Sequence, residues 1–101
     1  MFSILGFSQN KILDNIEMYY DQGNYKKVYK KSQKLLKTEE FKNSPTIKLF
    51  HALAEYQLSK TSKKHSVGNA YDSYRQFKQQ DLEGLFRLKF DIYIYDIQLG
   101  M

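Results

Sequence analysis

Apolar residues recur at intervals of three and four along most of this chain, and short polar breaks separate the periodic segments. This interval follows one face of an α-helix. The first two segments are joined by only a short link around Gly23, so we expect them to fold back on each other as an antiparallel hairpin. The pattern predicts an all-α fold of about five helices, at residues 9–21, 25–38, 45–59, 67–80 and 81–99.

Three polar residues mark where predicted helices begin. Ser44 precedes Pro45, which is a favourable start because the hydroxyl caps the first turn and the missing N–H of proline costs nothing there. Ser66 is expected to cap the fourth helix in the same way, and Asp81 the fifth. The charged stretch 60–65 between the third and fourth helices is predicted to be a mobile loop.

The last segment carries two apolar stripes at helical spacing. One stripe consists of Leu85, Leu88, Ile92, Tyr95 and Leu99, and the other of Phe86, Phe90, Tyr93, Ile94 and Ile97. Residues 90–97 also suit a β-strand, but a helix is favoured because the sequence offers no second strand to pair with it.

A final helix with two apolar stripes cannot bury both of them within five helices, and a large exposed apolar patch marks an interface. We therefore expect the stripe that begins at Leu85 to form a contact, either with a second copy of the chain or with the continuation of a longer protein. The alternative is a terminal helix that slots between the third and fourth helices.

The second and fourth predicted helices repeat one pattern. Val28-x3-Ser32-x2-Leu35 matches Ala70-x3-Tyr74-x2-Phe77 at an offset of 42 residues. With the turn around Gly23, these residues and the apolar helices before them (Ile12, Ile16 and Tyr19; Phe50, Leu53 and Ala54) resemble the tetratricopeptide repeat family. The resemblance implies one domain over residues 1–101, with repeats at 9–43 and 44–80 and the first helix of an incomplete third repeat at 81–101. It implies a right-handed solenoid of stacked hairpins.

The resemblance also implies a function and a site. Proteins of this family are non-enzymatic scaffolds whose first helices line a groove that binds a protein partner as a peptide or a helix. Carried over to this chain, the groove would present Asn10, Leu13, Glu17, Tyr20, Asp21, Lys48, His51, Glu55, Leu58 and Ser59. The family's clamp for a terminal carboxylate is not expected, because Leu13 and Glu17 stand where that clamp needs Lys and Asn.

Positive charge gathers in the middle of the chain. The formal net charge is +5, and residues 26–64 hold eleven lysines against three acids. The second predicted helix alone carries Lys26, Lys27, Lys30, Lys31, Lys34 and Lys37. A solvated helix face explains this row, and an anionic partner is the alternative, so a nucleic-acid-binding protein is our second hypothesis. The scarcity of Arg weakens the case for reading bases. Among the tyrosines, Tyr20 and Tyr93 are expected to be the most exposed.

The sequence offers no candidate for catalysis. Cysteine is absent, His51 and His65 lie apart, and no HExxH motif or glycine-rich phosphate loop occurs. We therefore expect no enzyme activity, cofactor or metal site. No apolar run is long enough for a transmembrane helix.

The first nine residues are apolar and then polar, and they allow two interpretations. They are similar to the end of a bacterial export signal, which would place the protein in the periplasm or outside the cell. Alternatively, residues 1–8 are an apolar arm that packs under the first helix, and the protein is cytoplasmic.

Overall fold

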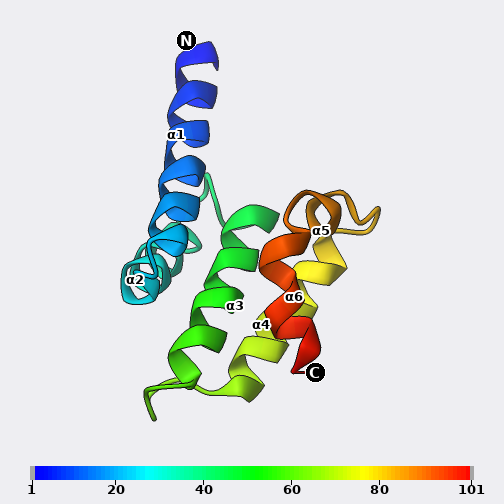
Figure 1. Ribbon diagram of the computed structural model, residues 1–101. Coiled ribbons are helices and arrows are strands. Elements are labelled where there is room, and N and C mark those ends of the chain that lie inside the picture. Colours follow the sequence, from blue (N-terminus) through cyan, green and yellow to red (C-terminus); the bar gives the residue numbers. More distant parts are fainter. Residues whose placement is uncertain (1, 101) are drawn as a thin grey trace.

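The computed structural model describes the backbone of residues 2–100 and the side chains of residues 10–100. Within that range the chain is helical and contains no strand (Figure 1). The helices are α1 (Phe2–Asp21), α2 (Tyr25–Leu35), α3 (Pro45–Ser59), α4 (Val67–Gln80), α5 (Leu85–Lys89) and α6 (Asp91–Leu99). The all-α prediction is confirmed, and the stretch that also suited a strand is helical.

The turn between α1 and α2 depends on Gly23, whose φ is +76°. Its backbone closes the turn, since the amide of Asn24 donates to the carbonyl of Tyr19 at 2.9 Å. Glycine adopts this left-handed conformation without the strain that a Cβ atom would bring. The chain thereby folds back, and α2 lies beside the second half of α1, inclined to it (Figure 1).

The second helix ends at Leu35, three residues before its predicted end at Thr38. The Thr38 hydroxyl donates to the Leu35 carbonyl and accepts from the Phe41 amide at 3.3 Å. Phe41 is buried with 5% of its surface exposed. The side chain of Thr38 therefore competes with the helix for backbone groups, and burial of Phe41 turns the chain towards α3.

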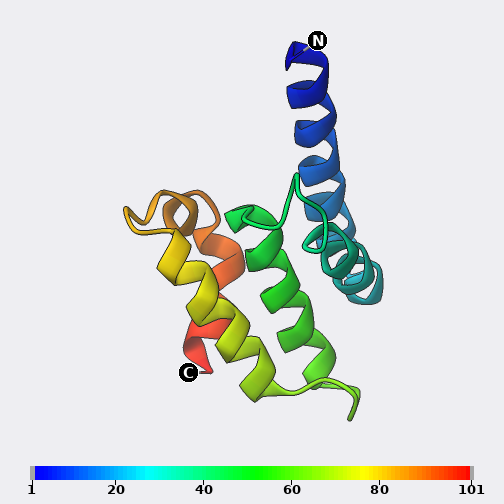
Figure 2. The same cartoon turned by 180° about the vertical axis from the view of Figure 1, so that it is seen from behind.

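The third helix is the centre of the molecule. It begins as predicted, because the Ser44 hydroxyl accepts from the Ile47 amide at 3.3 Å and Pro45 occupies the first turn. Both of its sides are buried, and α2 and α1 flank it on one side while α4 and α6 flank it on the other (Figures 1 and 2). Figure 2 shows α4 running antiparallel to α3. Ser66 caps α4 as expected, accepting from the Asn69 amide at 3.0 Å.

The predicted last helix is broken into two. Asp81 was expected to cap a helix that continues to Leu99, but it stands at the end of α4, and the next helix begins only at Leu85. The Asp81 carboxylate reaches forward and accepts from the amides of Phe86 and Arg87, at 3.1 and 3.0 Å, so it caps the short helix α5. The backbone then leaves helical geometry at Phe90, with φ −113° and ψ 28°, and Phe90 is buried.

The first helix extends beyond its predicted start at Gln9. It begins at Phe2, and its first half projects from the rest of the molecule (Figures 1 and 2). The backbone of residues 2–8 therefore continues α1 and does not form a separate arm folded beneath it. The side chains of this stretch lie outside the described part, so the packing expected of them, and Met1, are outside it as well. None of the helices in the described range is both long and apolar enough to cross a membrane.

Candidate functional site

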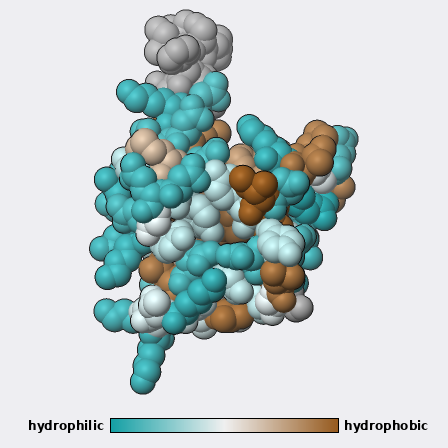
Figure 3. Space-filling model, viewed as in Figure 1, coloured by the Kyte–Doolittle hydropathy of each residue, from teal (hydrophilic) through white to brown (hydrophobic). Residues whose placement is uncertain are grey.

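An apolar face on α5 and α6 is the largest group of exposed hydrophobic side chains in the described part of the chain. It consists of Leu85 (61% exposed), Leu88 (74%), Ile92 (78%), Tyr95 (63%) and Leu99 (68%). These are the five residues of the predicted interface stripe. Figure 3 shows apolar side chains, in brown, over α5 and α6 on the right of the view. The second predicted stripe is turned inward, with Phe90, Ile94 and Ile97 buried.

The inward stripe places α6 against α3 and α4. The Gln57 amide on α3 donates to Asp96 at 3.4 Å, and the Gln98 amide donates to the Tyr74 hydroxyl on α4 at 3.2 Å. The helix therefore docks beside α3 and α4, as the alternative expectation held, while its opposite side remains apolar and open.

Three of the predicted groove residues come together between α1, α3 and the junction of α5 with α6. Asn10, Leu13 and Glu17 of the predicted set line a hollow of about 280 Å³ there. The hollow is completed by Asp14, Thr46, Lys89 and Phe90. Tyr20 does not line it and is 8% exposed, which contradicts the expectation that this tyrosine is among the most exposed. Its ring is buried against Phe50, Tyr25 and Tyr93.

The predicted groove residues of α3 do not lie in this hollow. Lys48 and His51 line a separate hollow of about 140 Å³ with Leu36, Ser73 and Gln76, on the side of α2 and α4. Glu55 and Leu58 are buried, and the Ser59 hydroxyl is bonded to the Tyr56 carbonyl. The side of α3 that faces α1 and α6 carries Phe50 and Gln57 instead, which the sequence pattern did not indicate as groove residues.

Tyr93 connects α6 to α1. Its hydroxyl lies 3.0 Å from Glu17 Oε2 and 2.7 Å from Asp21 Oδ1, so α6 is bonded to α1. Burial and these two carboxylates raise the pKa of Tyr93 above its ordinary value, because they oppose ionisation of the hydroxyl. Burial raises the pKa of neighbouring Tyr20 to about 12. Tyr93 is half-buried, so it is less exposed than we expected.

The five lysines of α2 and Lys37, which follows the helix, are all exposed. Hydrophilic side chains cover this part of the molecule in Figure 3. The ammonium of Lys27 lies 4.2 Å from the centre of the Tyr19 ring, a cation–π contact. These lysines do not form one continuous surface. Lys26 and Lys30 line one hollow, whereas Lys31 and Lys34 line another.

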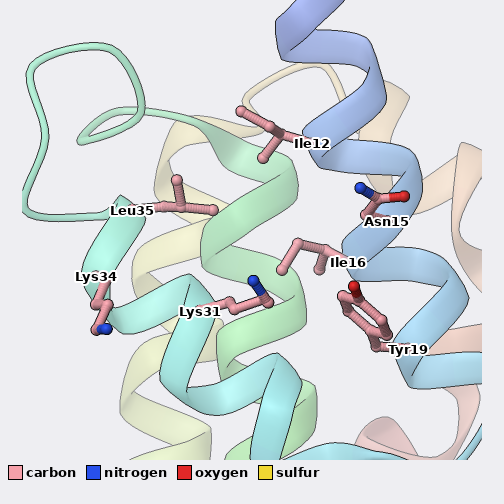
Figure 4. Close-up of a pocket in the computed structure, with 7 residues that line it drawn as sticks. All are labelled: Ile12, Asn15, Ile16, Tyr19, Lys31, Lys34 and Leu35. Atoms are coloured by element: carbon pink, nitrogen blue, oxygen red, sulfur yellow. The ribbon is translucent and has the colours of Figure 1, made fainter.

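The hollow beside Lys31 and Lys34 lies between α1 and α2 and has a volume of about 290 Å³. Figure 4 shows Ile12 and Ile16 of α1 facing Leu35 of α2 across it. Its walls are therefore largely apolar, and the lysines stand at its α2 edge.

The other hollow, here called the basic hollow, has a volume of about 540 Å³ and lies between α2 and the 60–66 loop. Its lining is mainly polar and cationic. It consists of Lys26, Tyr29, Lys30, Gln33, Leu58, Thr61, Ser62, Lys64 and His65.

A buried carboxylate holds the loop beside the basic hollow. Glu55 is 4% exposed, and both of its oxygens lie 3.0 Å from Nδ1 of His65. The amide of Ser66 donates to the same carboxylate at 3.0 Å. Because an ionised carboxylate only accepts, Nδ1 of His65 carries the proton. The stretch that the sequence predicted to be a mobile loop is therefore fastened to α3 at its C-terminal end.

Two imidazole rings pack against Tyr29. Its ring is stacked on His51, with centroids 4.7 Å apart, and meets the edge of His65 at the same distance. Nε2 of His51 is buried without a hydrogen-bond partner in the described structure. Burial lowers the pKa of His51, and the charge of nearby Glu55 only partly opposes this effect. His51 is therefore neutral near pH 7.

The described residues do not bring three or more His, Asp or Glu side chains together in a way that could hold a metal ion. The surfaces of the molecule are instead an apolar face, a partly acidic groove and a basic hollow. No protein-family model, curated protein or solved structure matches this chain.

Proposed function

We propose that this chain is a non-enzymatic protein-interaction module that buries the apolar face of α5 and α6 against a second copy of itself. The observation that carries the proposal is that five large apolar side chains of this face each expose more than 60% of their surface. Burying one such side chain is worth about 1.5–3 kcal/mol. Large apolar side chains gathered on the exposed side of two consecutive helices are typical of contact surfaces.

The order of the helices supports an architecture similar to tetratricopeptide repeats. Each of α1 and α3 is followed by a helix that packs on it, and α6 docks beside α3 and α4 as the first helix of a further hairpin would. In stacked repeats the terminal unit needs a polar outer face to remain soluble without a neighbour. The outer face of α6 is apolar at Ile92, Tyr95 and Leu99, so this end of the stack requires a cover.

A second copy is a suitable cover because a two-fold contact needs only one surface that is complementary to itself. The exposed apolar side chains can meet their own copies across the two-fold axis, and the exposed Lys89 and Asp91 beside them carry opposite charges. A standard interface buries about 800 Å² on each partner. The five large side chains of the face contribute to that area.

Light scattering over a dilution series tests self-association. We expect a dimer that dissociates on dilution, and we expect Ile92→Lys to be monomeric at concentrations where the unmodified chain is dimeric. Met18→Lys is the matched control, because Met18 is 43% exposed on α1, which carries no residue of the face. A monomer at every concentration, or equal dissociation by both variants, would remove the proposal.

Nucleic-acid binding is the second candidate, favoured by the exposure of the five lysines of α2 and of Lys37 beside them. A lysine surface that contacts phosphates releases counterions, so its affinity falls steeply as salt rises. A gel-shift series with single-stranded and double-stranded oligonucleotides tests this candidate. Absence of a shift at low salt eliminates it.

A further inference from the structure

The loop that lines the basic hollow is held in place by hydrogen bonds to α3. Glu55 is bonded to His65 Nδ1 and to the Ser66 amide, so the loop is attached to α3 by a buried carboxylate. The Tyr29 ring packs on His65 from the α2 side. Because these contacts exist without a ligand, the residues around the hollow are already in place for one, and little ordering is needed on binding.

The charge around the hollow is unbalanced. Lys26 and Lys30 approach it from α2, and Lys64 approaches it from the loop. No carboxylate is among its described lining residues. The nearest buried acid, Glu55, is already engaged by His65 and Ser66 and is not available to the three ammonium groups. The field in the hollow therefore favours an anion with more than one negative charge.

Neutral donors accompany the lysines. The Thr61 and Ser62 hydroxyls and the Tyr29 hydroxyl belong to the same lining. The Ser62 oxygen accepts from the Lys64 amide at 3.3 Å, which leaves its own proton free to donate. Burial, reinforced by the charge of Glu55, raises the pKa of Tyr29, so this hydroxyl stays protonated at neutral pH. An anion in the hollow would meet ammonium and hydroxyl donors from two sides.

We propose that the basic hollow binds a phosphate dianion, carried by a small phosphorylated compound or by a phosphorylated side chain. Phosphate brings about two negative charges and several acceptor oxygens at pH 7. Lysine binds phosphate as a point charge, and three lysines line the hollow, more than a single carboxylate would need. A volume of about 540 Å³ holds a phosphate with an organic group attached.

This site is independent of the proposed self-association. The hollow lies on α2 and the 60–66 loop, and the apolar face lies on α5 and α6. A chain that fails to dimerise could still bind phosphate, so the failure of one proposal leaves the other standing.

Isothermal titration calorimetry with pyrophosphate at low ionic strength tests the proposal. The hollow variant is Lys26→Gln/Lys30→Gln/Lys64→Gln. Its control replaces three lysines that do not line the hollow, Lys27→Gln/Lys34→Gln/Lys37→Gln, and both variants lower the formal net charge of +5 by three. We expect saturable binding that weakens about tenfold or more in the hollow variant and about twofold in the control. Circular dichroism checks that both variants fold.

Amide chemical shifts locate the site in the same titration. We expect the largest changes in chemical shift at Thr61, Ser62 and Lys64. A phosphoserine tripeptide is then titrated in competition with pyrophosphate. If the tripeptide binds more tightly, a phosphorylated side chain is the better source of the bound phosphate. Equal weakening in the two variants means that pyrophosphate, like an oligonucleotide, senses only net charge, and it overturns the proposal. Absence of pyrophosphate binding overturns it as well.

Discussion

The hydroxyl of Tyr93 lies 2.7 Å from Oδ1 of Asp21, and this contact joins residues that are 72 positions apart in the chain. Glu17 accepts from the same hydroxyl at 3.0 Å, one turn earlier on α1. The first helix, α1, and the last helix, α6, are thereby joined by direct hydrogen bonding. The groove between α1, α3 and α6 depends on this closure, because no other described hydrogen bond joins α1 to α6.

Tyr93→Phe should destabilise the fold by about 1 kcal/mol, because a hydrogen bond to a charged acceptor is lost from a site that is only half-buried. Urea denaturation measures the change. Tyr95→Phe is the control, since it removes the same atom from the same helix at a side chain that is 63% exposed. Equal effects of the two substitutions would contradict the role of the Tyr93 hydroxyl.

Asp81→Asn should cost about 1–3 kcal/mol, because the carboxylate receives two amide hydrogen bonds and the guanidinium of Arg87 while it is 3% exposed. Urea midpoints give the change, and Asp14→Asn on the exposed side of α1 is the control. If Asp81→Asn and Asp14→Asn differ by less than the error, α5 does not depend on this cap.

The stability of the fold should depend on the ionisation of Asp81 in acid. Burial alone would raise the pKa of Asp81, but the amides of Phe86 and Arg87 and the guanidinium outweigh it, and the pKa is lowered below 3.8. A carboxyl group with a lowered folded pKa stabilises the fold fully above its unfolded value. The contribution of Asp81 should therefore be present above about pH 4 and disappear as the pH falls below 3.8, and the Asp81→Asn variant should lack this part of the acid transition.

Local chemistry made some features of this fold predictable. Ser44 and Ser66 mark the starts of α3 and α4, because a serine hydroxyl before a periodic segment satisfies a free amide whatever the rest of the chain does. The break at Phe90 has no such local signal. It depends on the burial of Phe90 and on the cap from Asp81, which are tertiary features that periodicity does not contain.

Three of the groove residues predicted on α1 lie together, and none of those predicted on α3 lies beside them. Asn10, Leu13 and Glu17 share one side of α1, as its periodic pattern indicates, but Tyr20 of the same predicted set is buried. On α3 both sides are apolar and buried, and the sequence pattern does not say which of them faces α1 and α6. Phe50 and Gln57 face that way, while His51 and Glu55 face α2 and the loop. The basic hollow was missed for a related reason, since Lys64 and the lysines of α2 are far apart in sequence.

His51 should make the fold less stable in mild acid. Burial lowers its pKa below 6.5, so the unfolded chain binds a proton more readily than the folded chain does. The contribution of His51 to stability is therefore fully present above pH 6.5. It is lost as the pH falls through the interval between 6.5 and the lowered pKa of His51 in the folded chain. His51→Phe removes both the titration and the unpartnered Nε2 while retaining a ring to stack on Tyr29.

Urea midpoints of the unmodified chain and of His51→Phe, measured between pH 5 and 7.5, check this prediction. The variant should be at least as stable at pH 7.5 and should lose less stability towards pH 5. All other ionisable groups are present in both proteins, so only the difference between the two curves belongs to His51. Parallel curves would show that His51 does not titrate in this range.

Two glycines with equally open surroundings should respond to alanine in opposite directions. A Cβ atom added at Gly23 or at Gly68 would have no neighbouring atom within 4 Å, so neither substitution causes a clash. Gly23 has φ +76°, where alanine is strained, and Gly23→Ala should cost about 1 kcal/mol. Gly68 lies in the first turn of α4, and Gly68→Ala should stabilise the fold by about 0.5 kcal/mol because alanine loses less backbone entropy in a helix. The thermal unfolding temperatures of both variants, compared with that of the unmodified chain, test this prediction. An increase for Gly23→Ala would mean that the α1–α2 turn does not need a residue in the left-handed conformation.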